Sequence, residues 1–147
     1  MSKQTILSKR AFEKLIRDMV YLEEEHDLLL EYFDTASERA RFGQFIEKYI
    51  AQVDTLFRNI QVSDTNENAL PFVLVNSEVS LYPLDGSPAT KVRIVFPLQN
   101  TEETDISCLS SVGMSMLLKE LGDEVAVPSP SGSVRCRITS ILLTGHD

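Results

Sequence analysis

The sequence predicts an α+β protein in which a helical hairpin is followed by an antiparallel sheet with one short helix. Residues 1–68 contain no proline, one glycine and eight of the eleven aromatic residues. Residues 69–147 contain all six prolines, five of the six glycines and most of the β-branched runs. The composition changes within the polar segment 63–70, so we expect a helical domain at 1–68 and a sheet domain at 69–147.

The helical domain is predicted from apolar residues that recur at alternating steps of three and four, the spacing of a coiled-coil seam. Ser8 is expected to cap the first helix, which would span about 33 Å from Phe12 to Phe33. The seam positions are Phe12, Leu15, Met19, Leu22, His26, Leu29 and Phe33, then Phe42, Ile46, Tyr49, Val53, Leu56 and Ile60. The polar connector 34–41 favours an antiparallel coiled-coil hairpin with its tip there. The alternative is one long helix that pairs with a second chain.

The sheet domain is predicted from short β-branched runs separated by turn residues. The strand-like segments are Pro71–Val75, Val79–Leu84, Lys91–Leu98, Ile106–Leu109, Val125–Val127 and Val134–Leu143. Turns are expected at 85–88 and 99–104, and PSPSGS at 128–133 is a hairpin signal. Residues 112–120 have helical spacing, and Gly122 with Asp123 is expected to stop that helix.

The net charge of −8 comes from 14 basic and 22 acidic residues and is shared equally by the two domains. An acidic protein is poorly suited to grip nucleic-acid phosphates, so we expect no direct, sequence-specific binding to nucleic acid. No apolar run approaches the roughly 20 residues of a membrane span, and the first ten residues do not resemble a signal peptide. Two cysteines make no disulfide framework, which favours a cytoplasmic protein. The oligomeric state is left open, with a monomer favoured.

The residues of nucleophilic and metal catalysis form no recognisable motif in this chain. Cys108 and Cys136 lie 28 positions apart with no histidine near either, and both are interpreted as small buried apolar residues. His26 is interpreted as a polar seam residue that helps to fix the helix register. A P-loop and a nucleophile elbow are absent from the sequence. We therefore expect no enzyme and no intrinsic cofactor.

The candidate functional residues of the helical domain are Asp34 and Glu38, four positions apart at the expected tip. Two carboxylates at the end of a rigid rod could share a Mg²⁺ ion whose other ligands come from a partner. The structural alternative is capping of the second helix, by Asp34 or Ser37, with Glu38 favoured near a helix N-terminus. Arg39 and Arg41 would partly neutralise the tip.

The stretch 106–134, ISCLSSVGMSMLLKELGDEVAVPSPSGSV, resembles the C-terminal domain of the bacterial Gre transcript-cleavage factors. The family pattern S-P-x-G-x-A-L-L-G-x-x-x-G-D-x-V is kept at Ser110, Gly113, Leu117, Gly122, Asp123 and Val125. It is broken at Ser111, where the family usually has proline, and at Leu118, where it often has glycine. The resemblance extends over about 73–143 and implies an FKBP-like fold for this domain.

The helical domain is similar to the same family at 7–16, at the tip 37–42 and at 45–53. Its hairpin looks shorter by about one heptad in each helix, which is about 10 Å of reach. The resemblance implies that bacterial RNA polymerase is the partner and that the hairpin enters its secondary channel. Tip carboxylates of the family hold a second Mg²⁺ there and position the water that cuts backtracked RNA.

A rod shortened by about 10 Å should leave Asp34 and Glu38 outside the roughly 2 Å at which a carboxylate coordinates Mg²⁺. These two residues are also one position further apart than in the family pattern, and Arg41 replaces a tip glutamate. We therefore expect an elongation regulator with weakened or absent transcript-cleavage stimulation, like the short-hairpin regulator of nucleoside diphosphate kinase. The alternative is an active cleavage factor that supplies Asp34 and Glu38 to the Mg²⁺ of the polymerase.

The resemblance also implies a polymerase-binding segment before and within the short helix. Its residues are Leu109, Ser110, Ser111, Val112, Gly113 and Met114. Capping of the short helix by Ser110 or Ser111 is the structural alternative.

Two other classes of function stay open from the sequence. An FKBP-type prolyl isomerase would need an aromatic-lined pocket, for which residues 69–147 offer only Phe72, Tyr82 and Phe96. A coiled-coil module that binds another partner is the second.

Overall fold

The computed structural model describes residues 5–64, 67–97, 104–130 and 132–143. The described residues divide into two compact units, 5–64 and 67–143. The helical unit and the sheet unit are described separately below. In the described residues, no helix has both the length and the apolar character needed to cross a membrane.

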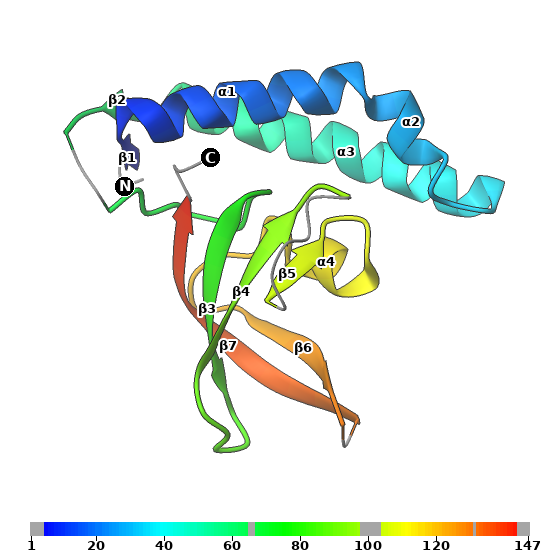
Figure 1. Cartoon of the computed structure of the whole chain (residues 1–147), viewed down its shortest axis with the longest axis vertical. Coiled ribbons are helices and arrows are strands. Elements are labelled where there is room, and N and C mark those ends of the chain that lie inside the picture. Colours follow the sequence, from blue (N-terminus) through cyan, green and yellow to red (C-terminus); the bar gives the residue numbers. More distant parts are fainter. Residues whose placement is uncertain (1–4, 65–66, 98–103, 131, 144–147) are drawn as a thin grey trace. The chain divides into compact units, whose positions relative to one another are not determined.

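The helical unit contains two short strands around three helices (Figure 1). Its elements are β1 (Thr5–Leu7), α1 (Lys9–Glu24), α2 (His26–Leu30), α3 (Ala36–Phe57) and β2 (Ile60–Val62). The two strands, which no sequence pattern predicted, pair in parallel with Thr5 opposite Ile60. This pairing joins the start of the first helical arm to the end of the second.

The two arms run antiparallel, as ring contacts at both ends show. Phe12 near the start of α1 contacts Phe57 at the end of α3, with ring centroids 5.9 Å apart. Phe33, after α2, contacts Phe42 in the second turn of α3 at 5.0 Å. Ser8 caps α1 as predicted, because its hydroxyl oxygen accepts the N–H of Ala11 at 3.1 Å.

The predicted seam forms the core of the helical unit. The buried seam residues are Leu15, Met19, Leu22, Leu29, Phe42, Ile46, Tyr49, Val53 and Leu56. Removing these apolar side chains from water is the main favourable contribution to packing the two arms.

The prediction of one continuous first helix from Phe12 to Phe33 is wrong. Glu25 leaves helical geometry at φ −101° and ψ 11°, which separates α1 from α2, and α2 ends at Leu30. The interruption falls in 23–27, where four of five residues are acidic and repel one another along the helix. The uninterrupted α1 has 16 residues and is therefore about 24 Å long.

The sheet unit contains five strands in the order β5-β4-β3-β7-β6, with one short helix between β5 and β6. Its elements are β3 (Ser77–Pro83), β4 (Thr90–Val95), β5 (Asp105–Ser107), α4 (Ser111–Met116), β6 (Glu124–Ser129) and β7 (Gly132–Leu143). The strands pair antiparallel except for β4 and β5, which are parallel, so the expectation of a purely antiparallel sheet is wrong. The three residues of β5 are too few for their sequence to indicate whether the strand pairs parallel or antiparallel.

Both turn signals in the described residues are confirmed. The Asp85 carboxylate accepts the N–H of Ser87 at 2.9 Å, and Gly86 has a φ of +90°. The β6–β7 hairpin closes with Val127 opposite Val134. The third expected turn, 99–104, lies outside the described residues except for Thr104.

Two predicted elements of the sheet unit differ from the structure. Pro71–Val75 is not a strand: Phe72 makes an isolated bridge to Glu120, and Val73 bonds to the chain just after α4. Val73, Leu74 and Val75 are buried in the core without a strand ladder, which the apolar run alone could not distinguish. The helix expected at 112–120 ends at Met116: Leu117 leaves helical geometry with ψ 137°, and Leu118 follows in a left-handed conformation with φ +70°.

Candidate functional site

The expected tip is a helix-capping turn at the start of α3. The Thr35 hydroxyl oxygen accepts the N–H of Glu38 at 3.0 Å, and the hydroxyl donates to the Glu38 carboxylate at 2.9 Å. This exchange between a cap residue and the residue three positions later stabilises a helix N-terminus. The expected cap, Asp34 or Ser37, is therefore wrong, and Thr35 caps the helix. The T-x-x-E spacing was a visible signal for it in the sequence.

Asp34 and Glu38 lie in the same turn and are both exposed, but their environments differ. The Glu38 carboxylate is bound by Thr35, whereas Asp34 has no hydrogen bond or ion pair with another described residue. Arg39 Nε donates to the carbonyl of Phe33 at 3.0 Å and closes the turn. In the described parts of the chain, no group of three or more His, Cys, Asp or Glu residues could hold a metal. A cation at the tip would therefore need ligands from a partner.

The second candidate site is the segment 109–114, which joins β5 to α4. Ser110 is the N-cap of α4: its hydroxyl oxygen accepts the N–H of Gly113 at 3.0 Å, and the hydroxyl donates to the carbonyl of Ser107 at 2.7 Å. The N–H of Ser110 also donates to Ser107 O at 3.1 Å. The Ser110 side chain is thus fully used within the protein, as the capping alternative expected.

Gly113 brings α4 against the end of β5. A Cβ atom at this position would collide with the carbonyl oxygen of Ser107 and lie 3.1 Å from Cα of Cys108. Gly113 is buried, Ser111 is exposed, and the other residues of the segment are half-buried. The surface of segment 109–114 is therefore formed by Leu109, Ser111, Val112 and Met114.

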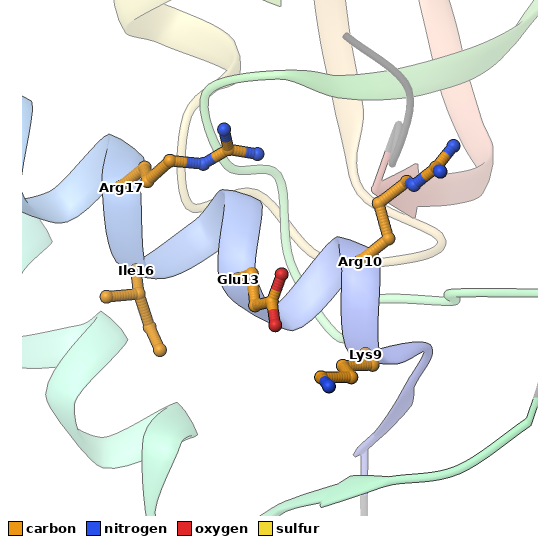
Figure 2. A pocket seen from close by; sticks show the side chains of 5 residues that line it. All are labelled: Lys9, Arg10, Glu13, Ile16 and Arg17. Atoms are coloured by element: carbon orange, nitrogen blue, oxygen red, sulfur yellow. The ribbon is translucent and has the colours of Figure 1, made fainter.

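A surface hollow of about 760 Å³ is lined by five residues of α1, all of them exposed (Figure 2). Lys9, Arg10, Glu13, Ile16 and Arg17 form this lining. Three of the five are cations, which contrasts with the acidic composition of the chain. The lining of the hollow includes none of the candidate site residues predicted from the sequence.

The two cysteines are free and buried, as predicted from their apolar context. Burial raises the pKa of the Cys108 thiol to about 12, and burial also raises the pKa of Cys136. A thiol with a raised pKa is mostly protonated near neutral pH and is a poor nucleophile. Neither cysteine therefore has the character of a catalytic residue.

Known proteins are similar to this chain first over the sheet unit and then over almost its whole length. The family model described as "Transcription elongation factor, GreA/GreB, C-term" matches residues 68–142. The transcription elongation factor GreA of Clostridium novyi (strain NT) is 30% identical over 155 aligned positions, covering 95% of this chain and 97% of that protein. GreA of Oceanobacillus iheyensis is 31% identical over 129 positions, covering 87% of this chain and 77% of that protein.

A solved structure agrees with this assignment in fold. The GreA/GreB elongation factor from Nitrosomonas europaea matches with a TM-score of 0.50 and 22% identity, covering 96% of this chain and 99% of that chain. The family model covers half of the sequence, and the Clostridium relative is aligned along almost its whole length. The chain therefore belongs to the GreA/GreB family of transcription elongation factors.

Proposed function

We propose that this protein binds bacterial RNA polymerase at its secondary channel and regulates elongation with weakened or absent stimulation of transcript cleavage. The chain would not be an enzyme itself, because cleavage in this family is performed by the polymerase and only stimulated by the factor. The proposal separates a docking part, the sheet unit, from a reaching part, the helical unit. Each part is supported by different observations.

The state of the tip carboxylates is the observation that carries the proposal. Glu38 Oε1 accepts a hydrogen bond from the Thr35 hydroxyl, which holds this carboxylate against the first turn of α3 and leaves Oε2 as the oxygen open to a cation. Asp34 is exposed just before the cap residue Thr35, and Arg39 and Arg41 bring positive charge close to it in the chain. Such a tip is poorly prepared to place two carboxylates on one metal ion.

The length of the chain supports a shortened reach. The alignment with the Clostridium novyi relative spans 155 positions, more than the 147 residues of this chain. Since 95% of this chain is about 140 residues, about 15 positions of that relative have no counterpart here, close to two heptads. One heptad lost from each arm would keep the seam in register and shorten the hairpin by about 10 Å.

The docking part rests on the exposed side of segment 109–114. Apolar and hydroxyl groups of Leu109, Ser111, Val112 and Met114 are available there, and capping by Ser110 fixes the backbone that carries them. A preformed surface loses little conformational entropy when it binds. Because Ser111 stands where the family usually has proline, we expect weaker binding than that of relatives with proline.

The test uses backtracked elongation complexes of bacterial RNA polymerase, with GreA of a relative as positive control. The expected result is little RNA shortening by this protein and no further change in the Asp34→Ala or Glu38→Ala variant. Added before GreA, the protein should also reduce the shortening that GreA produces, because both would occupy one channel. Strong shortening that Asp34→Ala or Glu38→Ala abolishes would instead establish an active cleavage factor.

A further inference from the structure

The strand that precedes segment 109–114 has few backbone contacts of its own. β5 has three residues, lies at the edge of the sheet and pairs only with β4 among the described strands. The N–H of Arg93 donates to Thr104 O at 3.0 Å, and the N–H of Cys108 donates to Val95 O at 2.7 Å. An edge strand this short needs further contacts to keep a fixed position.

A two-point ion pair provides such a contact. Arg93 Nε donates to Asp105 Oδ1 at 3.0 Å, and Arg93 Nη2 donates to Asp105 Oδ2 at 2.8 Å. The Asp105 side chain is only 1% exposed and that of Arg93 is 23% exposed. A buried carboxylate that loses its guanidinium partner is strongly destabilised, so this pair ties the first residue of β5 firmly to β4.

The position of β5 is passed on to α4 through Ser107. The Ser107 carbonyl accepts from both the N–H and the hydroxyl of Ser110, and Gly113 packs directly against the same carbonyl. Figure 1 shows α4 beside β5 within the sheet unit. A displacement of β5 would therefore displace the backbone of segment 109–114.

We propose that the Arg93–Asp105 ion pair is a positioning latch that holds segment 109–114 in the conformation that docks on RNA polymerase. The proposal rests on the proposed function, in which that segment contacts the polymerase. Arg93 and Asp105 are positioning residues: they act through β5 and Ser107, and they need not touch the partner.

The test combines amide hydrogen exchange with measured polymerase binding. In Arg93→Met, exchange at 107–114 should accelerate about tenfold or more, while amides of β3, β7 and α3 stay within about twofold. The dissociation constant for polymerase should rise about tenfold. The double variant Arg93→Met with Asp105→Leu replaces the pair by apolar side chains and should bring both values back to within about threefold of wild type. Arg93→Lys keeps the charge but loses the two-point geometry and should fall between these results.

The matched control is Arg135→Met, which removes an exposed ion pair to Glu124 on the opposite side of the strand order. It should leave exchange at 107–114 and polymerase binding unchanged. Faster amide exchange spread evenly over the sheet unit, or unchanged exchange at 107–114, would contradict the proposed latch. If Arg93→Met does not fold, the exchange rates of Arg93→Lys and of the double variant decide the question. Wild type that fails to bind polymerase would refute the proposed function, while the exchange result would still decide whether the latch holds the segment.

Discussion

The N-termini of α3 and α4 are both capped by a hydroxyl side chain, but the two caps leave their surroundings in different states. At the tip, Thr35 binds Glu38, so the candidate functional carboxylate is itself part of the cap. At α4, Ser110 binds Gly113 and Ser107, and the exposed Ser111 and half-buried Leu109, Val112 and Met114 side chains take no part in the cap. Under the proposed function, the cap at the tip restrains one of the two candidate carboxylates, whereas the cap at α4 fixes the backbone of the proposed docking segment.

The largest expected effect is on stability, and it should differ between alanine substitutions of Gly113 in α4 and Gly43 in α3. Gly113→Ala should lower the free energy of unfolding of the sheet unit by about 3 kcal/mol, because the new methyl group meets the Ser107 carbonyl. Gly43→Ala in α3 is the control, since a Cβ there meets no described atom within 4 Å, and it should add about 0.5–1 kcal/mol. Urea unfolding followed by circular dichroism measures both. Equal effects at the two sites would contradict the close approach of α4 to β5.

Removal of the caps gives the next effect. Ser110→Ala should cost about 2 kcal/mol, because the half-buried Ser107 carbonyl and the Gly113 N–H both lose a partner. Thr35→Ala lies in an exposed turn and should cost about 1 kcal/mol or less. The same urea titrations compare them. A larger loss in Thr35→Ala would mean that the tip, rather than α4, depends more on its cap.

A pH effect is expected at Cys108, which immediately precedes segment 109–114. Burial raises the pKa of the Cys108 thiol from 9.0 to about 12, so the folded state favours the protonated thiol. This stabilisation is fully present below pH 9 and is lost as the pH rises from about 9 toward 12. At pH 10 the loss should be about 1 kcal/mol relative to pH 8. The Cys108→Ala variant should lose this part of the pH dependence of unfolding. If the free energy of unfolding changes with pH equally in wild type and variant, the Cys108 thiol is not its cause.

The smallest expected effect concerns the backbone that follows α4. Leu118 has a φ of +70°, a conformation that costs a residue with a side chain about 1 kcal/mol relative to glycine. Leu118→Gly should therefore be about 1 kcal/mol more stable than Leu118→Ala, the reverse of the order in a helix. Thermal unfolding of the two variants compares them without the apolar contacts of leucine. If alanine is the more stable, residue 118 is not left-handed in solution.

Sequence patterns predicted the parts of the fold that depend on regular spacing. The heptad seam identified the buried faces of both arms, and Ser8 and the 85–88 turn followed from local chemistry. The apolar seam pattern did not predict the break at Glu25, because that pattern takes no account of the acidic run 23–27. The parallel direction of β5 was not predictable, because it depends on tertiary packing. The apolar run Pro71–Val75 was predicted as a strand because a buried unpaired segment and a paired strand show the same run of apolar residues.

The candidate sites were predicted in part. The pattern placed Asp34 and Glu38 in one turn, and the T-x-x-E spacing would have revealed the competing cap at Thr35. Segment 109–114 was proposed as a docking segment from its resemblance to the family and not from its own chemistry, and this role stays a prediction. The Arg93–Asp105 pair carried no signal, since the strands that bring these residues together had to be known first.

The parallel pairing of β1 with β2 fastens the two ends of the helical excursion to each other, with Leu7 opposite Val62. Everything between these strands begins and returns at one hydrogen-bonded base. Matched heptads can be inserted into or deleted from α1 and α3 without moving that base, provided that the seam keeps its phase. The length of the helical arm can therefore change, in evolution or by design, without a change in the rest of the protein.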